Sequence, residues 1–421
     1  MVSGVAGRMA FDGLLHLSQG SRPDLASVLL TPVNALRLAE SLSHMRGAAL
    51  KLGQMMSMDV GLVLPPALSE ILAKLRDDAQ PMPAAQVASV LNSAWGPHWR
   101  SRFTRFDMQP FAAASIGQVH RATSTDGREL AIKVQYPGVR ASIDSDLNNA
   151  ATLMRVPGLL PRGMDIAPLL TEAKQQLHQE ADYVAEARHL TRFNALLAGS
   201  DVFVLPEVEA DLSSATVLAM TYIESQPLES LTAAPQEVRN RVTGQLIELV
   251  LRELFELGFM QTDPNLANYR YEPQSKRVVL LDFGAVRNIA PELTADFRAL
   301  LDAALDRHTM RTRSAMQKIG YFDAKVAARH QALITQMFET AMTPLRQETP
   351  FDFGRTDLIE RLRDMGLAMG SDQDLNHVPP AATLFLHRKI GGMYLLATKL
   401  KACVALRPMV DAYRQSNIDR L

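Results

Sequence analysis

The sequence predicts an α+β fold in which helices surround a small region rich in strands. Strand-like stretches cluster between residues 104 and 136, and the turn residues 125–127 (Thr-Asp-Gly) separate two of them as in a hairpin. Before and after this region, apolar residues recur at the spacing of helices. We therefore expect a helical first part, a strand-rich middle part and a helix-rich last part.

Residues 1–100 are predicted to form helices and connectors. From Leu38 to Met56 the apolar positions alternate in steps of four and three, which marks one face of a helix. Pro65 and Pro66 then break the chain. Two further helices are expected, at residues 67–76 and 84–94. This part of the chain is therefore predicted to be a helical N-terminal extension.

The remaining elements follow in the order found in protein kinases: strands, a long helical stretch, a loop with a short hairpin, and helices. We expect a bilobal protein-kinase-like fold with a strand-rich lobe and helical insertion over residues 101–225 and a helix-rich lobe over residues 226–421. The expected strands are Thr104–Met108, Ile116–Thr123, Glu129–Tyr136, Val202–Glu207, Thr216–Ile223, Tyr269–Tyr271 and Arg277–Leu281. The expected helices include Val139–Leu153, Asp165–Leu197 and Gln236–Leu257.

The composition limits the partners and the compartment. Among 421 residues the net charge is -1, so the chain lacks the basic footprint of a nucleic-acid-binding protein. The single cysteine, Cys403, forms no internal disulfide and fits a reducing compartment. No uncharged apolar run approaches the roughly 18–20 residues that span a bilayer. Because no presequence rich in Arg and Ser is visible, we expect a bacterial cytoplasmic protein, soluble or peripheral at the inner membrane.

The strongest local signal is the triplet Asp282-Phe283-Gly284, which follows a short apolar strand. The aspartate of such a triplet in kinases holds a magnesium ion that bridges nucleotide phosphates, and phosphoryl transfer needs this charge neutralisation. A lone triplet also occurs by chance in turns. Asp282 is therefore a candidate metal ligand that needs support from other motifs.

The segment upstream supplies that support. Asp263 and Asn268 are five residues apart, as in the catalytic loop of kinases. Asp263 would accept or orient a substrate proton, and Asn268 would ligate a metal ion. The alternative is an Asx-rich turn before a strand. The D-F-G triplet nineteen residues after Asp263 favours the catalytic loop.

The strand predicted at residues 129–136 carries Lys133 in the string Ala-Ile-Lys-Val, which resembles the lysine that grips nucleotide phosphates. The alternative is a solvent-facing lysine, but a candidate nucleotide loop directly upstream argues against it. That loop has alanines where kinases have glycines, and alanine adopts φ > 0 only at a cost. It therefore cannot wrap a triphosphate in the usual way. Its residues are Ala112, Ala113, Ala114 and Ser115.

A kinase lysine needs a glutamate partner from a helix. The segment 178–187 supplies three acids, Glu180, Asp182 and Glu186, which do not all share one helical face. One of them can therefore pair with Lys133 while the others meet a different partner. The alternative is a merely solvated acidic helix.

Together these motifs resemble the UbiB family of atypical kinases. Its marks are a K-x-G-Q motif, an alanine-rich loop, a strand lysine, an E-x-D motif, a catalytic loop with Asp-Pro, and D-F-G. All six occur here in order, from Lys51 to Gly284, and residues 350–354 and 386–392 also look like family segments. Without the family, Lys51 and Gln54 would read as a surface pair on a helix. The resemblance covers the chain from about residue 35 to its end.

The catalytic loop indicates the branch. Many family members carry histidines where this chain has Gln261 and Asn265. The string at residues 260–265 looks like that of the mitochondrial ubiquinone-biosynthesis kinases and their bacterial relatives. Asp263 and Asn268 are retained, so the departure does not remove the predicted metal-site chemistry.

The resemblance implies a role for each candidate. Lys133 contacts the phosphates and pairs with Glu186, beside the alanine-rich loop. Asp263 is the catalytic aspartate, and Asn268 and Asp282 bind magnesium. A helical element carrying Lys51 and Gln54 covers the place where a protein substrate would otherwise dock, with Lys51 near the E-x-D acids Glu180 and Asp182.

The resemblance also implies an activity. It indicates an atypical kinase or ATPase that binds ATP or ADP with Mg²⁺ and supports ubiquinone biosynthesis. Its expected partners are a lipid-like quinone precursor or an anionic membrane surface, together with other ubiquinone-biosynthesis proteins, and not nucleic acid. Two alternatives stay open: a nucleotide-sensing scaffold for those proteins, and a small-molecule kinase.

Overall fold

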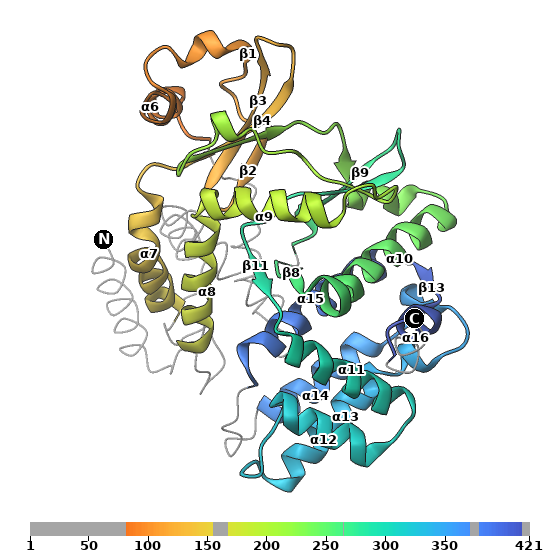
Figure 1. Ribbon diagram of the computed structural model, residues 1–421. Coiled ribbons are helices and arrows are strands. Elements are labelled where there is room, and N and C mark those ends of the chain that lie inside the picture. The colour runs from red at the N-terminus through yellow and green to blue at the C-terminus, as the bar shows by residue number, and fades with distance from the viewer. Residues whose placement is uncertain (1–80, 155–166, 264, 371–378, 415–421) are drawn as a thin grey trace, which may run out of the picture. The chain divides into compact units, whose positions relative to one another are not determined.

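The computed structural model describes residues 81–154, 167–263, 265–370 and 379–414 (Figure 1). These residues fall into two compact units. The helices predicted at residues 38–56 and 67–76, with Lys51 and Gln54, lie outside the described residues. The first unit comprises the described residues 81–154, 167–185 and 208–222, and the second comprises those of 186–207 and 223–414.

The first unit is built on a five-stranded antiparallel sheet (Figure 1). The strands follow the order β1-β3-β4-β6, and β2 pairs with β3. Four of them confirm predicted strands, and the predicted hairpin at residues 125–127 joins β3 to β4. The bounds are β1 Phe103–Phe106, β2 Ala112–Ala114, β3 Gly117–Ser124, β4 Glu129–Gln135 and β6 Val217–Thr221.

Helix α6 (Ala84–Trp95) confirms a predicted helix and covers the sheet of the first unit. Its apolar residues Val87 and Leu91 are one turn apart and share a face, and both are fully buried. They belong to one hydrophobic cluster with Ile132 and Val134 of β4. Because side chains alternate along a strand, Lys133 between them projects from the opposite face of the sheet.

The helix predicted over residues 165–197 is wrong as a single element. The chain forms α8 (Ala167–Glu180) and α9 (Tyr183–Leu196), and breaks between them at Ala181 and Asp182. The carboxylate of Asp182 accepts the backbone N–H of Ala185 at 3.0 Å, which is the N-cap interaction that starts α9. Helix α7 (Val139–Met154), as predicted, packs against α8 in the first unit.

A four-stranded sheet in the second unit has the order β5-β10-β9-β7. Strands β9 (Tyr269–Glu272) and β10 (Arg277–Leu280) form the predicted hairpin. Strand β5 (Phe203–Val204) joins the edge in parallel to β10, and β7 (Gln226–Pro227) pairs with β9. Two further antiparallel pairs are β8 (Phe259–Gln261) with β11 (Val286–Asn288), and β12 (Phe351–Asp352) with β13 (Cys403–Val404).

Helices make up most of the second unit (Figure 1). The long predicted helix is α10 (Gln236–Arg252), which continues into a π-helical turn at Glu253–Leu257. Gly258 then ends it with φ 56°, a left-handed conformation that glycine adopts without cost. The other helices are α11 Pro291–Leu305, α12 Thr309–Ile319, α13 Ala328–Ala341, α14 Leu358–Gly370, α15 Ala381–Lys399 and α16 Leu406–Asp411.

The turn between β2 and β3 leads to one position where only glycine fits. A Cβ atom on Gly117 would overlap the carbonyl oxygen of Val134 on the neighbouring strand and lie 2.8 Å from the Tyr183 hydroxyl. We expect Gly117→Ala to destabilise the first unit by about 1–3 kcal/mol, because the backbone of β4 cannot give way as a side chain would. The midpoint of urea unfolding measures this.

Gly391→Ala is the matched control. A Cβ atom at Gly391, inside α15, meets nothing within 4 Å. This replacement should leave stability unchanged or raise it by up to about 1 kcal/mol, because alanine favours the helix. Equal unfolding midpoints for Gly117→Ala and the unmodified chain would contradict the close approach at Gly117.

Candidate functional site

The predicted catalytic loop and the D-F-G triplet lie between two paired strands of the second unit. Strand β8 leads into the loop and β11 follows the triplet, and the two strands pair antiparallel, with Gln261 opposite Val286 (Figure 1). The pairing continues one step inward, where the N–H of Thr262 donates to the carbonyl of Ala285 at 2.9 Å. The β8–β11 pairing therefore holds the start of the catalytic loop next to the end of the D-F-G triplet.

Three of the predicted site residues lie close together in the segment between β8 and β11. The side-chain amide of Asn268 donates to the backbone carbonyl of Asp263 at 3.5 Å. The N–H of Leu281 donates to the carbonyl of Asn268 at 2.8 Å, which places Asp282 next to Asn268. Asn265 caps the short 3₁₀ turn Leu266–Asn268. The predicted spacing thus corresponds to a real cluster of Asp263, Asn268 and Asp282.

Asp282 has an unusual backbone conformation. Its φ is 57°, and its carboxylate accepts the N–H of Gly284 at 3.1 Å. Aspartate and asparagine tolerate this left-handed region better than other residues that have a Cβ. Strained backbone of this kind gathers at functional sites, so the conformation supports a role for Asp282 beyond that of a turn residue.

Helix α9 fixes the rest of the triplet and carries Glu186. The His189 ring lies with Nδ1 3.0 Å from the carbonyl oxygen of Phe283. One turn further, the Phe193 ring packs on Phe283 with centroids 4.7 Å apart and on Phe259 of β8 at 4.9 Å. Glu186 therefore projects from a helix whose following turns contact the triplet.

A second D-F-G triplet shows that the three residues alone do not specify a kinase-like metal site. Asp352-Phe353-Gly354 makes the same local bond, with the Asp352 carboxylate accepting the Gly354 N–H at 2.9 Å. However, the φ of Asp352 is −91°, and the residue lies on β12, which pairs with β13. The triplet at 282–284 is distinguished by its backbone conformation and by the catalytic loop beside it.

A buried ion pair stands beside the loop. The Lys389 ammonium of α15 lies 3.2 Å from the Glu253 carboxylate, and both side chains are 1% exposed. Burial by itself lowers the pKa of Lys389, but the charge of Glu253 and the hydroxyl of Tyr269 outweigh burial and raise the pKa above its ordinary value. Burial raises the pKa of the Glu253 carboxyl, although the charge of Lys389 and the Gln261 N–H act to lower it.

In the first unit, Lys133 is buried and its ammonium lies 5.1 Å from the centroid of the Tyr183 ring. Ser115 donates a hydrogen bond from its hydroxyl to the Glu180 carboxylate, so the structure joins the alanine-rich segment to the E-x-D motif. Asp182 caps α9. These contacts bring the first unit's predicted residues into two small groups around the start of α9.

The alanine-rich segment is a strand and not the expected loop. Ala112–Ala114 form β2, with Ala112 opposite Val119 and Ala114 opposite Gly117. Alanine accepts extended backbone readily, whereas a phosphate-wrapping loop needs glycine at several positions. The actual turn consists of Ser115 and Ile116.

The predicted pair of Lys133 with Glu186 joins one residue of each unit and stays a prediction. Lys51 and Gln54, predicted to cover the site, lie outside the described residues.

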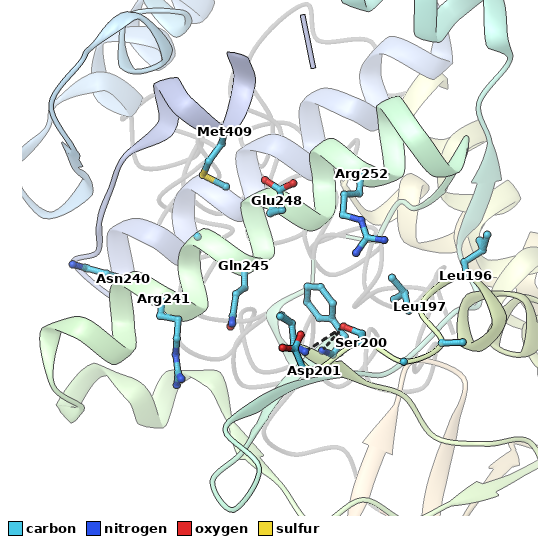
Figure 2. Close-up of a pocket in the computed structure, with 15 residues that line it drawn as sticks. Leu196, Leu197, Ser200, Asp201, Asn240, Arg241, Gln245, Glu248, Arg252 and Met409 are labelled. Carbon is cyan, nitrogen blue, oxygen red and sulfur yellow. Dashed lines mark hydrogen bonds between the residues drawn. The ribbon is translucent and has the colours of Figure 1, made fainter. Parts of the chain in front are cut away.

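A cavity of about 560 Å³ lies elsewhere in the second unit, between α10 and residues 196–203. Figure 2 shows Arg241, Gln245 and Glu248 of α10 along one side. The hydroxyl of Ser200 accepts the N–H groups of Val202 and Phe203, which fixes the opposite loop. None of the predicted site residues lines this cavity, so it is separate from the catalytic-loop cluster.

The residues present fit magnesium bound together with phosphates. Within the described parts of the chain, no three His, Cys, Asp or Glu side chains come close enough to hold a metal ion alone. Magnesium prefers oxygen ligands and is usually bound by one or two carboxylates with substrate phosphates and water. Asp282 offers a carboxylate. Because the Asn268 NH₂ group faces Asp263, its amide oxygen lies on the other side, where a cation would take it.

The class of protein follows from the comparison with family models. Residues 74–316 match the model of the ABC1 atypical kinase-like domain, which is more than half of the chain. The chain belongs to this family of atypical kinases. The predicted family and enzyme class are thereby confirmed.

The relatives define the branch. The chain is 39% identical to the mitochondrial atypical kinase coq-8 of Caenorhabditis elegans over 89% of its own length and 50% of the relative's. It is 34% identical to the mitochondrial atypical kinase COQ8 of Saccharomyces cerevisiae over 98% of its length and 83% of the relative's. The chain thus spans about half of the nematode protein and most of the yeast protein.

A solved structure supports the fold. Rv3197 of Mycobacterium tuberculosis, determined in complex with erythromycin, matches with a TM-score of 0.61 and 26% identity, over 85% of this chain and 90% of that one. The predicted α+β, protein-kinase-like fold class is confirmed. In the described part of the chain no helix is long and apolar enough to cross a bilayer.

Sequence reasoning missed three residues that the structure places at or beside the predicted groups: Tyr183, Glu253 and Lys389. Tyr183 follows the E-x-D motif and contacts Lys133. Glu253 and Lys389 each fall on the apolar face of a helix, where α10 buries Leu246 and Leu249 and α15 buries Met393 and Leu396. Opposite charges on two buried faces were a readable signal of an internal ion pair.

Two variants of Asp182 separate its capping role from its predicted gating role. Asp182→Ala removes the acceptor for the Ala185 N–H and should cost about 1 kcal/mol of stability, while Asp182→Asn keeps the cap and should cost almost nothing. Urea unfolding of both variants checks this. If Asp182→Asn also leaves ATP hydrolysis unchanged, the carboxylate charge has no gating role.

Proposed function

We propose that this chain binds ATP or ADP with Mg²⁺ and uses nucleotide hydrolysis or phosphoryl transfer to support ubiquinone biosynthesis. The observation that carries the proposal is the cluster of Asp263, Asn268 and Asp282, held together by the Asn268 side chain and the Leu281 N–H. The names of the relatives, mitochondrial COQ8 kinases, support the pathway.

The three clustered residues take the chemical roles. Asn268 and Asp282 hold a magnesium ion, which when bound neutralises charge on the phosphates. Asp263 orients the attacking hydroxyl or water and accepts its proton; it is 9% exposed, and its main chain is fixed by Asn268. Hydrogen bonds hold the main chain of Asp263 and Asn268 in place, and preorganisation of this kind supports electrostatic catalysis.

Lys133 and Glu186 complete the nucleotide site in the proposal. Lys133 contacts the phosphates, Glu186 orients it, and the Ala112–Ser115 segment borders the nucleotide. A paired strand of alanines does not close over phosphates as a glycine-rich loop does. The paired alanine strand therefore favours slow nucleotide turnover that is coupled to another process. It disfavours rapid phosphorylation of protein substrates.

That other process is the ATP-driven handling of a lipid-like quinone precursor at an anionic membrane surface, together with other ubiquinone-biosynthesis proteins. The pathway of the relatives supports this part, since quinone precursors with isoprenoid tails partition into membranes. The predicted bacterial cytoplasmic setting, soluble or peripheral at the inner membrane, is part of this proposal, whereas the relatives named above are mitochondrial.

Magnesium-dependent ATP hydrolysis tests the proposal. Activity is measured without lipid, with phosphatidylcholine vesicles, and with vesicles that also contain phosphatidylglycerol. We expect the anionic vesicles to stimulate hydrolysis, and Asp282→Asn to lower it on the order of 100-fold or more by removing a charged magnesium ligand. Asparagine keeps the left-handed backbone and the bond to Gly284, so the change is confined to charge.

Asp352→Asn is the matched control, because the second triplet makes the same bond to its glycine but lies on β12. Its activity should equal that of the unmodified chain. Nucleotide binding without turnover in any condition would contradict the enzyme and favour a nucleotide-sensing scaffold. Transfer of phosphate to an added small molecule, with no effect of vesicles, would favour a small-molecule kinase.

A further inference from the structure

We propose that Lys389 of α15 is a positioning residue for the predicted site. It holds the two ends of the catalytic-loop segment and, through Gln261, the main chain of Asp282 in place. The inference rests on the proposed function, because that segment supplies the magnesium ligands. It assigns a role to a residue outside the predicted magnesium ligands and the predicted catalytic loop.

The ammonium of Lys389 contacts three buried side chains. It donates hydrogen bonds to the Gln261 side-chain oxygen and to the Tyr269 hydroxyl, both at 2.9 Å. It also forms an ion pair with the Glu253 carboxylate at 3.2 Å. All four side chains belong to the second unit and are almost completely buried.

Gln261 connects the lysine to the entrance of the loop and to Asp282. Its amide oxygen accepts from Lys389 and, at 2.8 Å, from the Tyr269 hydroxyl. Its amide nitrogen therefore faces the other way and donates to the carbonyl of Asp282 at 3.3 Å. The amide has one orientation that satisfies every neighbour, and Lys389 helps to select it.

Tyr269 connects the lysine to the exit of the loop. It is the first residue of β9 and directly follows Asn268, while Gln261 is the last residue of β8 and lies two residues before Asp263. One ammonium thus holds both ends of the segment that contains Asp263 and Asn268. Loss of the ammonium leaves the Tyr269–Gln261 bond at 2.8 Å to join the two ends without the support of α15.

Glu253 supplies the negative charge that compensates the buried Lys389 ammonium. It begins the π-helical turn after α10, and its second carboxylate oxygen accepts the N–H of Gln261 at 3.2 Å. Single π-helical turns within helices occur often at functional sites. Here the turn presents the carboxylate to the lysine and to the backbone of β8 at once.

The test uses the double variant Lys389→Met/Glu253→Gln. Methionine fills the space of the lysine stem, and glutamine keeps an acceptor for the Gln261 N–H, so no buried charge is left unpaired. Magnesium is titrated against the full chain saturated with ADP, and ADP alone is titrated in EDTA. We expect the apparent magnesium affinity to fall about 10–100-fold, as when groups that orient metal ligands are removed, with metal-free ADP affinity unchanged.

Arg346→Met is the control for a general loss of stability. Arg346 is another basic side chain of the second unit, and it donates to the carbonyl of Ala304 at 2.8 Å and pairs with Glu339 at 2.6 Å, away from the loop. It should leave magnesium affinity unchanged even if it lowers the unfolding midpoint. Tyr269→Phe, which removes one acceptor, should shift magnesium affinity in the direction of the double variant by a smaller factor.

Hydrogen–deuterium exchange decides the inference independently of nucleotide. The double variant should exchange faster than the unmodified chain at the amides of residues 262–268 and 281–284, and equally at α11. Unchanged exchange there, or unchanged magnesium affinity in a chain that binds ADP, would overturn the positioning role. An unmodified chain that binds no nucleotide would refute the proposed function, while the exchange comparison would still test Lys389.

Discussion

The burial of the Lys389–Glu253 pair is the constraint on which the second unit depends. Removing two charges from water costs several kcal/mol for each ion, and only good geometry with further hydrogen bonds offsets that cost. The structure meets the requirement with Gln261 and Tyr269, which lie at the two ends of the catalytic loop. The ion pair is satisfied in one arrangement of β8, β9 and the π-helical turn, and therefore favours that arrangement over others.

Local chemistry explains how much of the fold could be predicted. Four of the five strands of the first unit, α6 and the β9–β10 hairpin follow from periodicity and turn residues close in sequence, and the structure confirms them. The predicted helix over residues 165–197 failed at Asp182, because an aspartate inside a helical pattern also makes a good N-cap, and the pattern alone does not decide. The alanine segment failed for a similar reason, since alanine suits helix, loop and strand.

In the candidate site, too, the residues close in sequence could be predicted and the distant partners could not. Asp263, Asn268 and Asp282 were predictable because their spacing is short and their motif is local, although Asp352 shows that a D-F-G triplet needs its surroundings to be interpreted. Lys389 was not predictable as a partner of Gln261, since 128 residues separate them. Its charge on an apolar helix face was visible, but the partner of a buried charge is set by tertiary packing, which no spacing rule encodes.

In the first unit, three of the predicted motifs are connected through contacts of side chains near the start of α9. Strand β2 is held in its ladder by pairing with β3, and Gly117 leaves no room between β3 and β4. The hairpin turn at Ser115 is different, because its hydroxyl bonds to Glu180, the first acid of the E-x-D motif, at the break between α8 and α9. A change at that break reaches the alanine hairpin through one hydrogen bond and reaches Lys133 through Tyr183. The α8–α9 junction is therefore linked within this unit to both the alanine hairpin and Lys133.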